Sequence, residues 1–315
     1  MFERLDSDEP VRLVCEPGIP EQVHVFDDSS RLAVKSALAA GRPLLLRGEP
    51  GVGKTQLAVA TAAVLNRPLV ACVVDSRTES TELLLQFDSI RRLAEAQVCG
   101  VLKLNQKELE ERLNVKRYVQ PGPLWWGFDW DGAYKHAEDR GFAIPPVGKG
   151  CDPANGRVVL IDEIDKADSD LPNGLLEALG AGRFTPQGFT AVQMQDPAPL
   201  VIVTTNEERV LPDAFVRRCL VLHLSLPESE SELTDLLVKR GREHFPGIEQ
   251  QLLEKAATLL VGDRRQASSP KPGQAEFLDL LRAVQKLEAQ GVDTADNRLH
   301  DVADFTLKKH SGGQR

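Results

Sequence analysis

The chain has 315 residues, which is too long for one minimal domain and allows a large and a small folding unit. Hydrophobic residues make up 42% and charged residues 27%, close to ordinary globular usage, which excludes wholesale disorder. The formal net charge of −9 disfavours a surface that grips nucleic acid throughout, because such binding neutralises phosphates with Lys and Arg.

The N-terminal residues, MFERLDSDEP, are charged and lack the apolar core of a signal peptide. No apolar run approaches the length needed to span a bilayer. The five cysteines are scattered and include no CxxC pair, which is typical of reduced thiols. We therefore expect a cytoplasmic protein that makes no contact with a membrane.

Helices and apolar strands alternate from residue 29 onward. Residues 29–40 have helical spacing, and the apolar run 44–46 after them is too short for a buried helix, so we expect a central parallel strand there. The same reasoning predicts a helix at 55–66 and strands at 69–74, 158–161, 200–204 and 220–224. This alternation is typical of an α/β fold with a parallel sheet and helices on both faces.

The last part of the sequence changes to amphipathic helices only. Apolar residues from Phe277 to Leu287 recur at i, i+3, i+4 and i+7, the pattern of one buried helical face. We therefore predict an α/β core over residues 1–226 and a small α-helical domain over residues 227–315.

A long insertion interrupts the predicted sheet near residues 80–157. Such a segment is too long for a structureless loop, and we expect helices at 81–96 and 106–113 within it. The turn-rich segment PGPLWWGFDWDG follows and contains all three tryptophans, Trp125, Trp126 and Trp130. They could form an exposed surface for a partner or pack the insertion's own core, and we adopt the partner surface as the hypothesis to test.

The segment GEPGVGKT satisfies GxxxxGK[ST] between a predicted strand and a predicted helix, as this phosphate-binding loop (P-loop) requires. Its glycines let backbone N–H groups turn toward phosphate oxygens, and the helix N-terminus adds a favourable dipole. Lys54 would reach the β and γ phosphates of ATP, and Thr55 would ligate Mg2+. The residues expected to bind the nucleotide are Gly48, Glu49, Pro50, Gly51, Val52, Gly53, Lys54, Thr55 and Gln56.

Two carboxylates end the apolar strand at 158–161, at the sheet edge where α/β proteins bind ligands. In this Walker B pattern, Asp162 would hold Mg2+ and Glu163 would activate the attacking water. Asn206 ends the next strand and could hydrogen-bond that water or the γ-phosphate as a sensor, although a plain Asn turn is the alternative.

Two adjacent arginines, Arg217 and Arg218, precede the last predicted strand. Adjacent arginines are usually surface charge, but these stand where an arginine finger would stand.

Taken in order, the P-loop, LIDEIDKA, TTNEE and PDAFVRRC resemble the MoxR-type branch of AAA+ ATPases. The segments RTESTELLLQFDSIRRLAEAQ, GPLWW and LPNGLLEAL also resemble this group. The resemblance covers most of residues 25–290 and implies an α/β ATPase core, a small helical lid and a hexameric ring with ATP between neighbouring subunits.

Further roles follow from the resemblance alone. Arg217 or Arg218 would reach the neighbour's γ-phosphate, and the sequence does not choose between them. The basic sensor-two residue of the lid falls near SSPKPGQAEFLDLL, where Lys271 is our assignment, in place of the commoner Arg. The resemblance also implies a protein client, often a partner with a von Willebrand factor A domain.

The leading functional expectation is an ATPase that remodels or assembles a partner protein. The alternative is an ATP-controlled oligomeric signalling switch of a bacterial defence or conflict system, for which slow turnover with ATP-dependent assembly would be the distinguishing observation. A nucleic-acid motor is less favoured, because the chain is acidic and contains no recognisable DNA-binding module.

Overall fold

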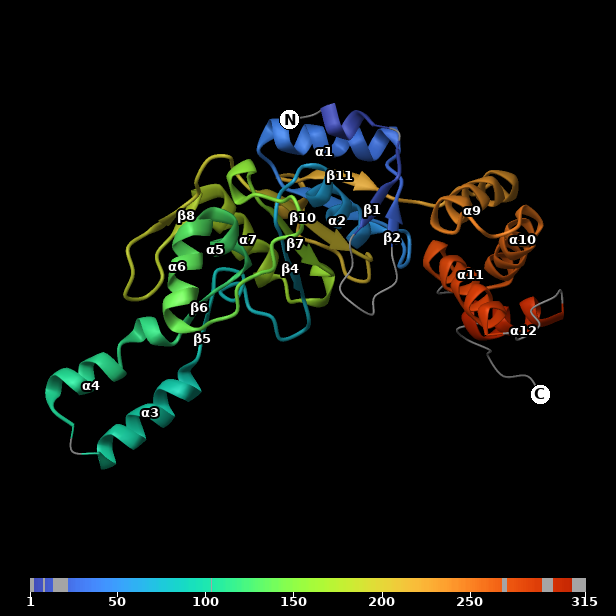
Figure 1. Ribbon diagram of the computed structural model, residues 1–315. Coiled ribbons are helices and arrows are strands. Elements are labelled where there is room, and N and C mark those ends of the chain that lie inside the picture. Colours follow the sequence, from blue (N-terminus) through green and yellow to red (C-terminus); the bar gives the residue numbers. More distant parts are fainter. Residues whose placement is uncertain are drawn as a thin grey trace. The chain divides into compact units, whose positions relative to one another are not determined.

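The computed structural model describes residues 3–7, 9–13, 22–102, 104–267, 271–290 and 297–307 (Figure 1). The chain divides into two compact units. The first contains the described residues within 1–6, 29–46 and 61–222, and the second those within 7–28, 47–60 and 223–315. No helix among the described residues is both long enough and apolar enough to cross a bilayer.

A parallel sheet of five strands, in the order β11-β3-β10-β7-β4, organises the fold. Its strands are β3 (Leu44–Arg47), β4 (Leu69–Val73), β7 (Val158–Asp162), β10 (Leu200–Thr205) and β11 (Leu220–His223). Val158 pairs with Leu69 on one side and with Leu200 on the other. All six residues of β10 are buried, as expected for a central strand that carries an uninterrupted apolar run. The predicted α/β fold class and its strands are confirmed.

Helices and short strands precede the strands of the sheet or lie between them in the sequence. The helices are α1 (Asp28–Ala40), α2 (Lys54–Val64), α7 (Asp170–Ala181) and α8 (Asp213–Val216). Two short antiparallel pairs join β1 (Val11–Leu13) to β2 (Gln22–His24) and β8 (Arg183–Phe184) to β9 (Val192–Gln193).

The insertion begins with a pair of antiparallel strands, β5 (Leu85–Phe87) and β6 (Val119–Pro121), which enclose α3 (Ser89–Val101) and α4 (Gln106–Arg112). Figure 1 shows α3 and α4 extending from this strand pair, away from the sheet. The helix expected at 81–96 was therefore placed too early. Residues 85–87 are committed to strand pairing, and the Asp88 side chain caps α3 by accepting a hydrogen bond from the Arg91 N–H at 2.8 Å.

The aromatic segment is helical, which corrects the expectation of a turn-rich stretch. Gly122 is the N-cap of α5 (Pro123–Phe128), and Pro123 occupies its first turn, where proline's missing N–H costs nothing. Helix α6 (Trp130–Arg140) follows. Gly127 lets α5 approach the sheet, because a Cβ there would lie 2.7 Å from Cγ2 of Val159.

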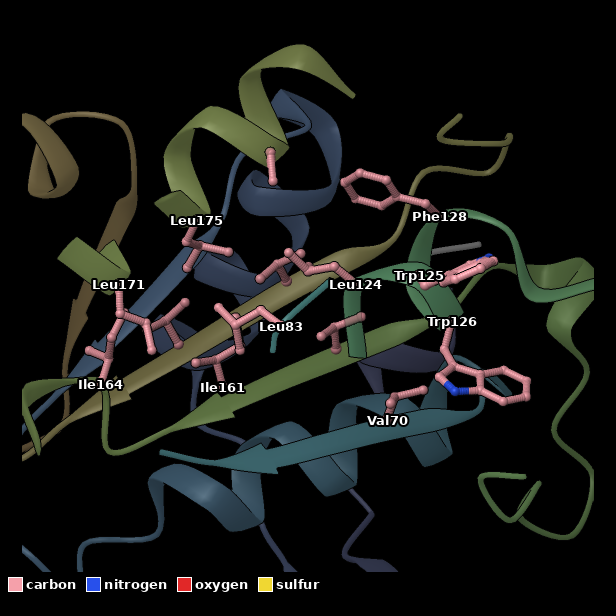
Figure 2. Close-up of a cluster of buried hydrophobic side chains, with 14 of the residues drawn as sticks. Val70, Leu83, Leu124, Trp125, Trp126, Phe128, Ile161, Ile164, Leu171 and Leu175 are labelled. Atoms are coloured by element: carbon pink, nitrogen blue, oxygen red, sulfur yellow. The ribbon is translucent and has the colours of Figure 1, made fainter. Parts of the chain in front are cut away.

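The three tryptophans lie in the core of the first unit. Trp125 and Trp126 are each 3% exposed and Trp130 is 6% exposed. Figure 2 shows Trp125 and Trp126 among the buried side chains over the sheet, and the Trp126 and Trp130 rings meet edge to face at 5.1 Å. The partner-surface hypothesis for these residues is wrong, and the core-packing alternative is confirmed.

The C-terminal region is helical, as predicted, and belongs to the second unit. Its helices are α9 (Glu230–His244), α10 (Gln250–Gln266), α11 (Gln274–Ala289) and α12 (Asn297–Thr306). Leu237, Leu253 and Phe277 are at most 1% exposed in the core of this unit. Val52 of the P-loop is part of the same core, so the loop is anchored to the helices that follow residue 227.

Candidate functional site

The P-loop connects β3 to α2 and takes its shape from three glycines. Gly48, Gly51 and Gly53 have φ angles of 147°, 78° and 102°, a region that favours glycine. A Cβ at Gly48 would lie 2.1 Å from the carbonyl oxygen of Leu224, so no larger residue fits there without a shift of the backbone. The backbone at these three positions is therefore one that glycine adopts readily and other residues rarely do.

Lys54 folds back over this loop. The residue is 7% exposed, and its ammonium donates to the carbonyls of Gly48 at 2.7 Å and Glu49 at 2.9 Å. Thr55 is exposed in the first turn of α2. Gln56 instead donates from its side-chain amide to the carbonyl of Val23 at 3.1 Å, and so fixes β2.

An arginine that sequence reasoning missed lies beside the P-loop. Arg264, in the last turn of α10, forms an ion pair with Glu49 at 2.5 Å and donates to the carbonyl of Pro272 at 3.0 Å. Lys271, the residue assigned to the sensor-two role, is exposed between α10 and α11. The only sequence signal for Arg264 was its place among the basic residues at a helix C-terminus.

The N-terminus of α11 also contacts the P-loop. The Ala275 N–H donates to the Gly51 carbonyl at 3.2 Å, and a Cβ built on Gly51 would lie 3.3 Å from the Ala275 Cβ. Glu276 accepts from the Gly273 N–H at 2.9 Å and so caps this helix end. These contacts tie the loop to the helical region through backbone groups, which the sequence pattern could not show.

The Walker B strand β7 ends at Asp162, beside a buried threonine of β10. The Thr204 hydroxyl donates to Asp162 Oδ1 and accepts from the Glu163 N–H at 2.9 Å. Glu163 has a φ of 59°, an uncommon left-handed conformation for a residue with a side chain. Strained backbone of this kind is frequent where a functional side chain must be aimed.

The Glu163 carboxylate contacts two side chains. Lys166 Nζ lies 2.6 Å from Oε2, and the Asn206 side-chain amide donates to Oε1 at 3.4 Å. The hydrogen bond and the negative charge of Glu163 raise the pKa of Lys166. The structure therefore places Asp162, Glu163 and Asn206 together, as predicted, and adds Lys166, which the sequence analysis overlooked.

Arg217 and Arg218 follow α8, and both are exposed. The Arg42 guanidinium donates to the backbone carbonyls of both residues, at 2.9 Å for Arg218. Both arginine side chains thus extend from a fixed backbone, and burial does not distinguish one from the other.

Comparison with known proteins gives a family match and distant relatives. Residues 43–240 match the AAA domain of the dynein-related subfamily. The chain is 28% identical over 233 residues to the chaperone protein ClpB of Mycobacterium leprae, covering 71% of this chain and 22% of that protein. It is 25% identical over 324 aligned residues to ClpB of Corynebacterium glutamicum, covering 95% of this chain and 32% of that protein. This chain thus spans a third or less of the length of these relatives.

Among solved structures, the RuvB Holliday junction branch migration motor of Thermotoga maritima superposes with a TM-score of 0.45 at 17% identity. The superposition covers 88% of this chain and 67% of RuvB.

Proposed function

We propose that this chain, which belongs to the AAA domain family (dynein-related subfamily), hydrolyses ATP to ADP and phosphate. The observation that carries the proposal is the contact between Glu163 and Asn206 at the ends of two neighbouring strands, in a chain that also has a complete P-loop. A carboxylate and an amide so placed can activate and orient a water molecule.

The P-loop and Lys54 bind the phosphates of the nucleotide. The ammonium now bonds to two neutral carbonyls, and charged phosphate oxygens are stronger acceptors than these. Glu163 takes the proton from the attacking water, and Asn206 holds that water or the γ-phosphate in line. Lys271 and Arg264 are both candidates for the basic lid residue, and Arg264 forms an ion pair with Glu49 of the P-loop.

The residues present suit Mg2+, which such a reaction requires. Thr55 supplies a hydroxyl and Asp162 a carboxylate, the oxygen ligands that Mg2+ prefers. The ion would neutralise charge on the β and γ phosphates. Thr204, by donating to Asp162 Oδ1, fixes the orientation of this carboxylate.

We also propose that hydrolysis changes the conformation or assembly of a partner protein. Helix α3 supports this proposal, because Ile90, Leu93 and Val101 are 82%, 62% and 84% exposed on it. A row of exposed apolar side chains on a projecting helix is typical of a protein interaction surface. The resemblance to MoxR-type ATPases points the same way and adds a hexameric ring and a von Willebrand factor A-domain partner to the proposal.

Phosphate release by the purified chain tests the ATPase proposal. Wild-type protein should hydrolyse ATP, and Glu163→Gln should keep ATP bound while turnover falls by at least about 10²-fold. Lys54→Ala should lose nucleotide binding in calorimetry, since the charge aimed at the phosphates is gone. Full turnover in Glu163→Gln, or unchanged ATP affinity in Lys54→Ala, would contradict the assignment.

A trapping experiment tests the partner proposal. With ATP present, tagged Glu163→Gln should retain a protein partner that Lys54→Ala does not. Adding Ile90→Glu and Val101→Glu to the trap should release the partner, because charge replaces the apolar surface of α3. Leu32→Glu is the matched control, since Leu32 is 66% exposed on α1. Equal capture by all four proteins would refute the proposal.

A further inference from the structure

We propose that Asp165 positions the sensor residue Asn206 against Glu163 for hydrolysis. The inference rests on the proposed ATPase function and assigns a role to a residue outside the Walker B pair. Asp165 lies in the short turn after β7 and is 1% exposed, although it is an acidic residue. Burying a carboxylate is costly, so the contacts it makes must compensate.

Those contacts hold the loop after β10. One carboxylate oxygen of Asp165, Oδ2, accepts from the backbone N–H of Asn206 at 3.2 Å and from that of Glu208 at 2.9 Å. The intervening Glu207 has a φ of 61°, and its N–H donates to the Thr205 hydroxyl at 2.9 Å. Three successive N–H groups of the loop therefore have side-chain acceptors, two of them on Asp165.

This anchoring determines where the Asn206 amide can reach. An asparagine side chain is short, so its amide follows the position of its own backbone. That amide donates to Glu163 Oε1 at 3.4 Å, at the long end of the hydrogen-bond range. If the backbone of Asn206 moves outward by about 1 Å, the amide loses its hydrogen bond to Glu163, and a misplacement of this size can cost about 10²-fold in rate.

The second carboxylate oxygen of Asp165 allows a variant that removes the negative charge of this residue and keeps its hydrogen-bond acceptor. Oδ1 is buried and has no hydrogen-bond partner among the described residues. Asp165→Asn can keep an acceptor oxygen facing the two N–H groups and place its amide nitrogen at the Oδ1 position. Asp165→Ala removes the acceptor altogether. If Asp165 acts by positioning, the Asn variant should largely rescue the defect of the Ala variant.

Steady-state kinetics of the full chain test the inference. Asp165→Ala should lower kcat about 10- to 100-fold while the KM for ATP stays within about threefold, because the P-loop is untouched. Asp165→Asn should stay within about threefold of the wild-type kcat. Asp168→Ala is the control, as it removes the same charge from a side chain that is 88% exposed. Wild-type kcat in Asp165→Ala, or equal losses in the Ala and Asn variants, would overturn the inference.

Hydrogen exchange of the Asn206 and Glu208 amides gives a readout that is independent of turnover. Both amides should be protected in the wild type and in Asp165→Asn and should exchange rapidly in Asp165→Ala. Unchanged protection in Asp165→Ala would show that Asp165 does not anchor the loop. If protection behaves as expected but the wild type releases no phosphate, the ATPase proposal is what fails.

Discussion

Lys166 Nζ and Glu163 Oε2 form an ion pair of 2.6 Å directly after the Walker B strand. Glu163 is the residue to which we assign water activation, so one of its oxygens is held by a cation. The pair also explains why the pKa of Lys166 is raised, since the hydrogen bond to Glu163 and its negative charge favour the protonated form.

We predict that Lys166→Met raises basal ATP turnover about 2- to 10-fold, because it removes the ion pair and leaves that oxygen of Glu163 available to the attacking water. Phosphate release at saturating ATP measures the change. Lys135→Met, at an exposed site on α6, removes the same charge and should leave turnover unchanged. A fall in turnover in Lys166→Met would contradict this prediction and would show that Lys166 holds the Glu163 carboxylate in its active orientation.

The second prediction concerns the stability of the second unit at acidic pH. Burial, followed by the charge of Arg240, lowers the pKa of His24 from 6.5 to about 4. Burial, followed by the charge of Arg282, lowers the pKa of His244 likewise to about 4. Between pH 6.5 and 4 the unfolded chain binds protons that these folded histidines do not bind. The free energy of unfolding should therefore fall as pH drops through this window. Below pH 4 these two histidines should cause no further fall.

The effect can be isolated by substitution of His24, which is 7% exposed. Urea unfolding of the wild type and of His24→Gln should be compared at pH 7 and pH 5. The drop in the free energy of unfolding should be smaller in the variant by about 2 kcal/mol. Circular dichroism is the suitable probe, because all three tryptophans lie in the other unit. Equal drops in both proteins would show that His24 is not buried in its neutral form.

The third prediction concerns Trp126, whose burial replaces the surface role first expected for it. Trp126→Ala should lower the free energy of unfolding by about 3 to 5 kcal/mol, because it leaves a cavity beside Trp130. Tyr134→Ala on α6 is the control, since Tyr134 is 40% exposed and should cost much less. Chemical denaturation measures both, and similar small losses would place Trp126 at the surface after all.

Whether the sequence predicted a structural feature depends on how far apart in the sequence its interacting residues lie. The strands of the sheet were predictable because each is a continuous apolar run, and the P-loop because a local motif specifies its backbone. Strand β5 was not, because its three residues pair with residues more than thirty positions away in the sequence. The same holds for Arg264 with Glu49, which are brought together by folding alone.

Lys166 and Asp165 were missed for a different reason. Both lie next to the Walker B carboxylates, but an isolated sequence does not show that one side chain turns toward Glu163 and the other into the interior. A buried acidic residue and a charged surface residue look alike until the contacts of their side chains are known.

The last prediction is that the active site is completed by a neighbouring subunit. Arg217 and Arg218 are exposed, and Arg42 holds the carbonyls of both, so either guanidinium is available to a second molecule. A finger supplied in trans stabilises charge on the transferred phosphate and is worth about 10³- to 10⁵-fold in rate. One of Arg217→Ala and Arg218→Ala should lose hydrolysis and still bind ATP, and the other should behave as the wild type. Specific activity of the wild type should also rise with protein concentration as subunits associate.

Mixing inactive proteins provides the decisive measurement. The arginine variant that lacks activity should be combined with Lys54→Ala, which cannot bind the phosphates. In a head-to-tail assembly, some interfaces then join an intact P-loop on one subunit to an intact arginine on the next, so part of the activity should return. Mixing that arginine variant with Glu163→Gln should restore activity for the same reason, because the two defects lie on opposite sides of the interface. The trans arrangement is wrong if neither mixture recovers activity, or if specific activity does not change from dilute to concentrated wild-type protein.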